Sequence, residues 1–133
     1  MNKFDVWLDL ECNIAGSLTV LCNLFAQREF SVRPLRGENI TFWPGKDSAQ
    51  DFYLVTVVGI KAHHYVSTEI EDLNHHFHPN EHSFSSTTYL RLRAVQVASV
   101  SDARSVVSFL TSQHGFEIDP YSTNRLDDAD DVP

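Results

Sequence analysis

The sequence predicts an α+β fold in which helices cover one face of a four-stranded antiparallel sheet. Residues 4–12 alternate between apolar and polar side chains, as a half-buried strand does. Residues 51–61 are apolar on both faces and rich in β-branched side chains, which is typical of a central strand. Residues 101–115 space their apolar side chains as a helix does and end in a glycine.

The first strand predicts two faces of different character. Its even positions, from Phe4 to Cys12, are apolar and form the side that faces the core. Its odd positions point to the opposite side, because successive strand residues alternate. They place carboxylates around a tryptophan on a surface that faces water, formed by Asp5, Trp7, Asp9 and Glu11.

Two helices are predicted between the strands. Apolar residues at positions 14, 18, 21 and 25 recur at helical spacing after Asn13, a residue type that caps helices. Thr68 and Glu71 have the spacing of a capping box, in which each side chain satisfies the other's free amide. Pro79 ends this second helix. Its apolar side consists of Tyr65, Ile70, Leu73 and Phe77.

The remaining elements complete the order. Residues 40–43 predict an edge strand between prolines and glycines. Residues 88–99 predict the last strand, with Arg91 and Arg93 on its polar face. Ser101 then caps the C-terminal helix, and Gly115 follows its last turn. The order β-α-β-β-α-β with an added C-terminal helix matches the ferredoxin-like plan.

In this plan the first and last strands are antiparallel neighbours. Arg91 and Arg93 are therefore expected opposite Asp9 and Glu11. We predict a single domain over residues 1–120. The acidic tail over residues 121–133 is expected to be disordered, because its Asp-Asp-Ala-Asp-Asp run offers little apolar surface to bury.

The chain is acidic, with 18 Asp and Glu against 10 Lys and Arg and a net charge of −8. This balance argues against nonspecific binding to nucleic acid or to anionic membranes. The two cysteines lack the spacing of a zinc site, and the N-terminus lacks the basic and apolar regions of a secretion signal. No apolar run approaches the ~18 residues that a membrane span needs. We therefore expect a cytoplasmic protein.

No catalytic motif stands out in the sequence. G-x-S-x-G, C-x-x-C and H-E-x-x-H are all absent. His75, His78 and His82 would share one side of a helix and are weak candidates for a metal site, but Pro79 interrupts that helix. We expect no enzymatic activity, no metal and no cofactor. A metal-dependent enzyme that uses residues 63–82 is the less favoured alternative.

The outward side of the first strand is the candidate surface for a partner. Aromatic side chains within a charged surround are typical of binding hot spots. Trp7, Tyr89 and Tyr53, with Trp43 as a further member, are expected among the carboxylates of this surface. The alternative is that the C-terminal segment or a second copy of the chain covers it. The expected partner contacts are Asp5, Trp7, Asp9, Glu11 and Tyr89.

In size, acidity, absence of catalytic motifs and this acidic and aromatic surface, the chain resembles the small immunity proteins that bacteria encode beside secreted or contact-delivered toxins. The resemblance implies a role, the occlusion of a basic toxin such as a nuclease. It implies no particular fold or site, because these families share no common fold. A second hypothesis is a small-ligand-binding or regulatory ferredoxin-like module that forms a homodimer through Tyr53, Val55 and Val57.

Overall fold

The computed structural model describes residues 4–16, 20–45, 52–56, 59–63, 65–79 and 84–120. The predicted acidic tail, residues 121–133, lies outside these ranges. The described elements, in chain order, are β1 (Phe4–Ile14), β2 (Val20–Phe30), β3 (Asn39–Phe42), β4 (Phe52–Thr56), β5 (Gly59–His63), β6 (Val66–Pro79), β7 (Phe84–Leu92), β8 (Val95–Val97), α1 (Val100–Gln113) and β9 (Glu117–Ile118).

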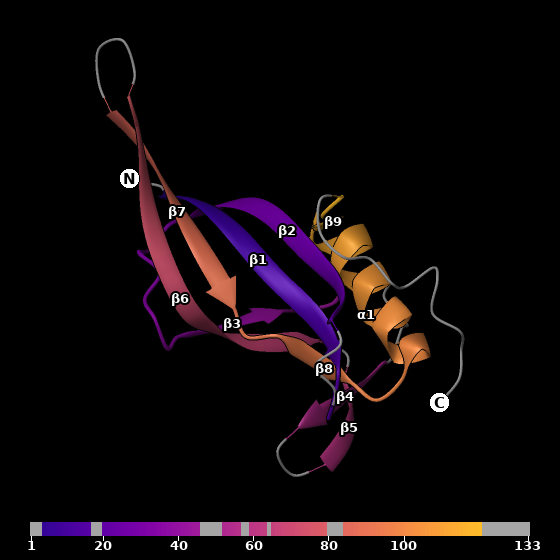
Figure 1. The fold of residues 1–133 in the computed structure, drawn as a ribbon. Helices are drawn as coiled ribbons and strands as arrows, with labels where there is room; N and C mark the ends of the chain where they lie inside the picture. Colours follow the sequence, from indigo (N-terminus) through magenta and orange to yellow (C-terminus); the bar gives the residue numbers. More distant parts are fainter. Residues whose placement is uncertain are drawn as a thin grey trace.

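Strand β1 lies at the centre of a nine-stranded mixed sheet (Figure 1). β2 runs antiparallel along one edge of β1. β7 and β8 share the other edge and both run parallel to β1, with β7 beside residues 6–9 and β8 beside residues 12–14. The sheet continues from β7 through β6 to β3, and from β8 through β4 to β5. β9 adds to the outer edge of β2.

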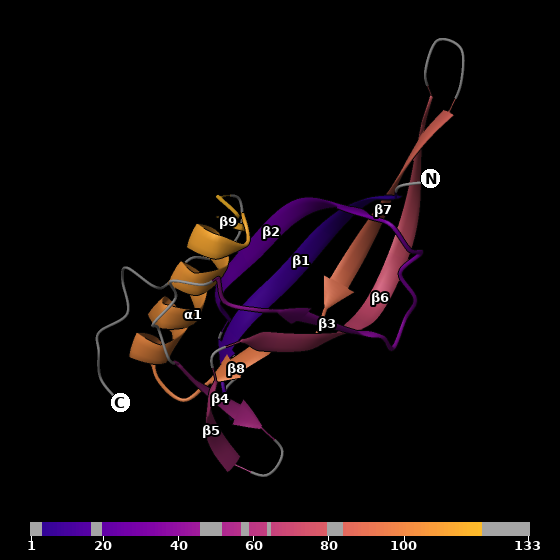
Figure 2. The same ribbon diagram turned by 180° about the vertical axis from the view of Figure 1, so that it is seen from behind.

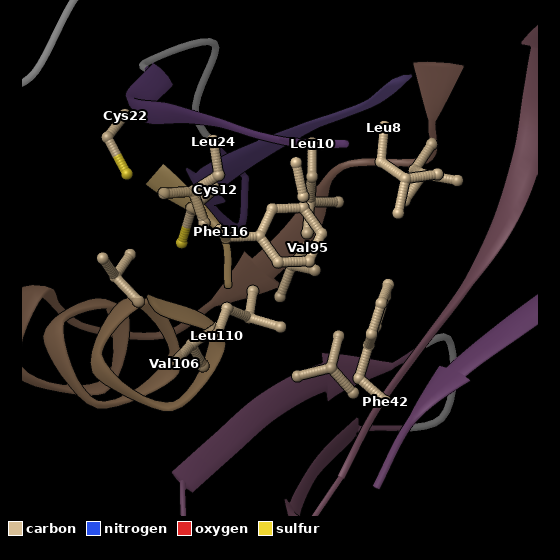
Figure 3. Close-up of a cluster of buried hydrophobic side chains, with 14 of the residues drawn as sticks. Leu8, Leu10, Cys12, Cys22, Leu24, Phe42, Val95, Val106, Leu110 and Phe116 are labelled. Carbon is tan, nitrogen blue, oxygen red and sulfur yellow. The ribbon is translucent and has the colours of Figure 1, made fainter. Parts of the chain in front are cut away.

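The sheet curls around one hydrophobic core. Leu8 and Leu10 of β1 share this core with Phe42 of β3, which comes from the far end of the sheet, and with Leu110 of α1 (Figure 3). α1 lies beside β1 and β2 in both ribbon views (Figures 1 and 2). The opposite face of β1, β2 and β7 points away from this core, and its Tyr89 remains 40% exposed.

The predicted four-stranded antiparallel sheet of ferredoxin-like order is wrong, because two of its three helices are strands. The first predicted helix falls mainly in β2, where Cys22, Leu24 and Ala26 alternate inward. The pairing of β1 with β2 shifts register between Cys12 and Asn13, and Leu21 is buried next to Cys22. This β-bulge breaks the two-residue period and leaves apolar spacings that imitate a helix.

The second predicted helix, which Pro79 was expected to end, is the long strand β6. Ile70 and Leu73 both pack toward the core although they are three residues apart, because the register with β7 shifts between Ile70 and Asp72. A spacing of three is the helical signature, so this bulge also misled the prediction. Thr68, predicted as a helix cap, donates its hydroxyl to the carbonyl of Arg93 at 2.6 Å.

The alternation predicted for the first strand is confirmed. Its inward residues Val6, Leu8, Leu10 and Cys12 are at most 1% exposed. The predicted neighbour is also present, but β7 runs parallel to β1 rather than antiparallel. Arg91 lies opposite Asp9 as predicted, whereas Arg93 pairs with Glu69 at 3.5 Å and not with Glu11.

The stretch predicted as a central strand is a hairpin of β4 and β5 at one end of the sheet. The predicted C-terminal helix is confirmed, with its start moved to Val100. Ser99, rather than Ser101, is the N-cap, and its Oγ accepts the Asp102 N–H at 3.1 Å. The helix ends at Gln113 with His114 as its C-cap, and Gly115 follows with the positive φ of 68° that glycine adopts without strain.

Candidate functional site

A row of aromatic rings crosses four neighbouring strands on the side of the sheet that points away from the core. The ring centroid of Trp7 in β1 lies 5.8 Å from that of Phe25 in β2 and 6.3 Å from that of Tyr89 in β7. The planes of Trp7 and Tyr89 are nearly parallel, at 9°. Tyr89 in turn lies 4.3 Å from the imidazole of His76 in β6. We call these four rings the ring row.

Carboxylates border the ring row on both sides of β1. Directly paired strand residues present their side chains on the same face. The register therefore places Glu29 beside Asp5, and Glu117 of β9 beside Phe25. Asp119 follows Glu117 by two residues and acts electrostatically on Asp9. We call the surface formed by the ring row with Asp5, Asp9, Glu11, Glu29, Arg91, Glu117 and Asp119 the outer face.

Asp9 is the carboxylate that the outer face perturbs most clearly. Partial burial raises the pKa of the Asp9 side chain above its usual value of 3.8. The Arg91 guanidinium opposes this shift, and the carboxylates of Glu11 and Asp119 add to it. An ionised Asp9 is therefore less stable here than in water, and a further cation beside it would favour its charged form.

Arg91 is the cation among the residues of the outer face. It lies opposite Asp9 in the register, and its Nη2 forms an ion pair with Glu11 Oε1 at 3.5 Å. Its side chain is 62% exposed, so water screens the pair strongly. The residues that define the outer face therefore include six carboxylates and one guanidinium, so their formal charge is negative.

All five residues predicted to contact a partner lie on the outer face. The prediction depended on β1 and the last strand being neighbours, which holds although their relative direction differs. Five members of the outer face were missed: Phe25, His76, Glu29, Glu117 and Asp119. Phe25 and His76 were assigned to helices. Glu29 reaches the site only through the pairing of β2 with β1, and Glu117 and Asp119 only through β9. An alternation check at residues 22–27 would have placed Phe25 on the outward side of a strand.

Two further aromatic residues were predicted on this surface. Trp43 is 63% exposed, but it contacts Tyr65, with 4.7 Å between the ring centroids, at the end of β3. Its carbonyl oxygen accepts a hydrogen bond from His114 Nε2 at 2.7 Å. The side chains of Tyr53, Val55 and Val57 lie outside the described part of the structure. The homodimer contact predicted through these three side chains therefore lies outside the described part as well.

The histidines proposed as weak metal candidates do not come together in the described ranges. The Nδ1 of His75 lies 3.0 Å from the hydroxyl of Thr88, on the core-facing side of β6. The side chain of His78 and all of His82 lie outside the described residues. Over the described residues, no group of three or more His, Cys, Asp or Glu side chains is arranged to hold a metal ion.

The two cysteines face each other across β1 and β2 on the core side. Cys12 and Cys22 are direct partners in the register, and both are free thiols (Figure 3). Burial raises the pKa of Cys12 to about 12, with a further contribution from Cys22, and raises that of Cys22 to about 11. Because the thiolate is the reactive form, both residues serve as packing groups here.

Among the described elements, no helix has the length and apolar character to cross a membrane. No family model, curated protein or solved structure matches this chain. The outer face is therefore interpreted from its own chemistry. It offers aromatic ring surfaces and carboxylate oxygens, which together suit a cationic group with apolar or planar surroundings.

Proposed function

We propose that this chain is a non-catalytic binding protein that captures a basic protein partner on its outer face, as immunity proteins do with cationic toxins. One observation carries the proposal, namely a ring row across four strands that carboxylates border. Aromatic rings at the centre of a charged rim are the usual composition of a protein interface. The net charge of −8 favours a partner of opposite sign.

The group that this surface suits best is an arginine side chain. A guanidinium stacks on the face of a tryptophan or tyrosine and donates two parallel hydrogen bonds to a carboxylate. Trp7 and Tyr89 supply the rings, and Asp9 lies next to Trp7 along β1 on the same face. A bound guanidinium would lower the raised pKa of Asp9, so binding in acidic buffer is expected to release protons.

In the proposed mechanism, the carboxylates and the ring row act on different steps of binding. The carboxylates attract the basic partner over a distance of about a Debye length and accelerate association. The ring row, once covered, slows dissociation. Charge reversal at Asp9 and Glu11 is therefore expected to slow association more at low salt than at high salt. Association that is unchanged at low salt would remove these two carboxylates from the proposal.

The direct test uses the emission of Trp7. The variant Trp43→Phe leaves Trp7 as the single tryptophan, since the chain has two. A tetra-arginine peptide is titrated against this variant, and a tetra-citrulline peptide serves as the uncharged control of the same shape. We expect saturable quenching or shift of the Trp7 emission with the arginine peptide alone, weakening as salt rises.

Matched variants separate a local contact from the effect of net charge. Asp9→Asn with Glu11→Gln removes two carboxylates from the outer face, and Glu69→Gln with Glu71→Gln removes two from β6 outside it. The first pair is expected to weaken the Trp7 response at least about tenfold, and the second less than about threefold. Equal losses in the two pairs, or equal responses to arginine and citrulline, would contradict the proposal.

A further inference from the structure

We propose that two copies of this chain pair through the open edge of β6 and form a two-fold dimer with a continuous sheet. Over the described residues, β6 pairs with β3 along residues 66–69 on one edge and with β7 along residues 70–79 on the other. The end of the β6–β7 hairpin extends beyond the remaining strands in both ribbon views (Figures 1 and 2). Its β6 edge beyond Asp72 has no strand partner among the described residues.

The hydrogen-bond pattern identifies which backbone groups face this open edge. Leu73 donates its N–H to the Asp72 carboxylate at 3.0 Å, so this N–H is turned away from β7. In an antiparallel pair, successive residues point their backbone groups alternately toward and away from the partner strand. His75 and Phe77 therefore present their N–H and C=O groups outward, as a second strand requires.

Other groups block strand addition at both ends of the open stretch. Arg36 donates its Nε to the Glu71 carbonyl at 3.0 Å and its Nη2 to Asp72 Oδ1 at 2.9 Å. At the other end, Pro79 has no N–H to offer. These features limit strand addition to the stretch between Leu73 and Pro79, which is one way that natural edge strands restrict pairing.

The open stretch is complementary to itself. A two-fold axis at His76 places His75 of one copy opposite Phe77 of the other, on both sides of the axis. Each such pair exchanges two backbone hydrogen bonds, because both residues face the same edge. The contact is isologous, so it closes at two copies and does not propagate.

The absence of carboxylates, ammonium groups and guanidinium groups from the open stretch favours pairing with a second copy. The stretch from Asn74 to His78 holds no carboxylate, ammonium or guanidinium, in a chain whose net charge is −8. An antiparallel pairing also places the two bodies at opposite ends of the paired hairpins. Because a short strand pair contributes few hydrogen bonds against the cost of association, we expect a weak, concentration-dependent dimer.

The pairing also extends the outer face. His76 is the last ring of the row, and the axis places it beside His76 of the second copy. The two ring rows would then meet in one surface across both sheets. The dimer itself does not depend on the proposed function, so either can fail without the other.

The test compares two substitutions at one residue. His75→Pro removes an N–H that faces the open edge and leaves the hydrogen bonds to β7 in place. An edge strand tolerates proline at such a position. His75→Ala removes the imidazole and keeps the N–H. Sedimentation velocity from about 10 µM to about 1 mM should show a dimer for the native chain and for His75→Ala, but a monomer for His75→Pro.

A second variant and a second measurement protect the test against misfolding. Phe77→Pro removes the other outward N–H and should also give a monomer with a native circular dichroism spectrum. Hydrogen exchange of the His75 and Phe77 amides in the native chain should slow as concentration rises. A native chain that stays monomeric throughout this range, or a His75→Pro variant that still dimerises, would overturn the proposal.

Discussion

The two faces of strand β1 differ in what their residues contribute. The inward face is continuous apolar surface that stabilises the fold, with Leu8 and Leu10 almost completely buried. The outward face carries a tryptophan among carboxylates, and burial makes ionised Asp9 unfavourable there. Groups that lower stability on an exposed surface are more readily explained by binding than by folding. The inward face therefore stabilises the fold, and the outward face is the surface that we propose for recognition.

The largest expected difference is in thiol reactivity. Cys12 and Cys22 lie on the inward face with pKa values raised to about 12 and about 11. Labelling by a maleimide should therefore require unfolding and proceed at least about a thousandfold slower than in denaturant. The measurement is the labelling rate by mass spectrometry with and without urea. Labelling at the rate of a free thiol in native buffer would show that the inward face is open.

The next effect concerns neighbouring residues on opposite faces of β1. Leu10→Ala leaves a cavity in the core and should lower the free energy of unfolding by about 2–5 kcal/mol. Glu11→Ala removes only a screened ion pair with Arg91, so its cost should stay below about 1 kcal/mol. Urea denaturation measures both. Similar losses for the two variants would break the distinction between the faces.

The ring row itself should contribute little to stability. Tyr89→Ala removes the contacts with Trp7 and His76, and aromatic pairs are worth about 0.5–1.5 kcal/mol beyond the area they bury. We expect a loss of about 1–2 kcal/mol together with a clear loss of binding to the tetra-arginine peptide. A variant that binds normally would exclude Tyr89 from the recognition surface.

The smallest expected effect is a gain in stability. The raised pKa of Asp9 means that the folded chain binds this proton more tightly than the unfolded chain does. The ionised carboxylate therefore lowers stability above the raised pKa, and this penalty disappears below the usual value of 3.8. Asp9→Asn should raise the Tm at neutral pH, and the difference should vanish near pH 3. Asp5→Asn, at an exposed position of the same face, is the matched control.

The sequence supported the outer face better than it supported the fold. β1 was predicted correctly because its alternation is uninterrupted from Val6 to Cys12. β2 and β6 were not, since bulges at Cys12/Asn13 and at Ile70/Asp72 replace the period of two with helical spacings. Local pattern also does not specify whether neighbouring strands run parallel, which depends on the whole chain path.

The residues of the outer face also differ in whether the sequence alone could predict them. Trp7 and Asp9 follow from one strand, and Tyr89 follows from the expected neighbour. Phe25 and Glu117 reach the face only through long-range pairing of β2 with β1 and with β9. No feature within residues 115–120 predicts a strand of two residues at that edge, because so short an element is specified by its partner and not by its own periodicity.

The most direct test of recognition by the outer face is a map of backbone amide and indole NMR shifts during titration with the tetra-arginine peptide. The account predicts that the largest shifts cluster on Trp7, Asp9, Phe25 and Tyr89 and that Asp9→Asn with Glu11→Gln reduces them. Shifts confined to the acidic residues 121–133, with the indole of Trp7 unchanged at saturation, would contradict it.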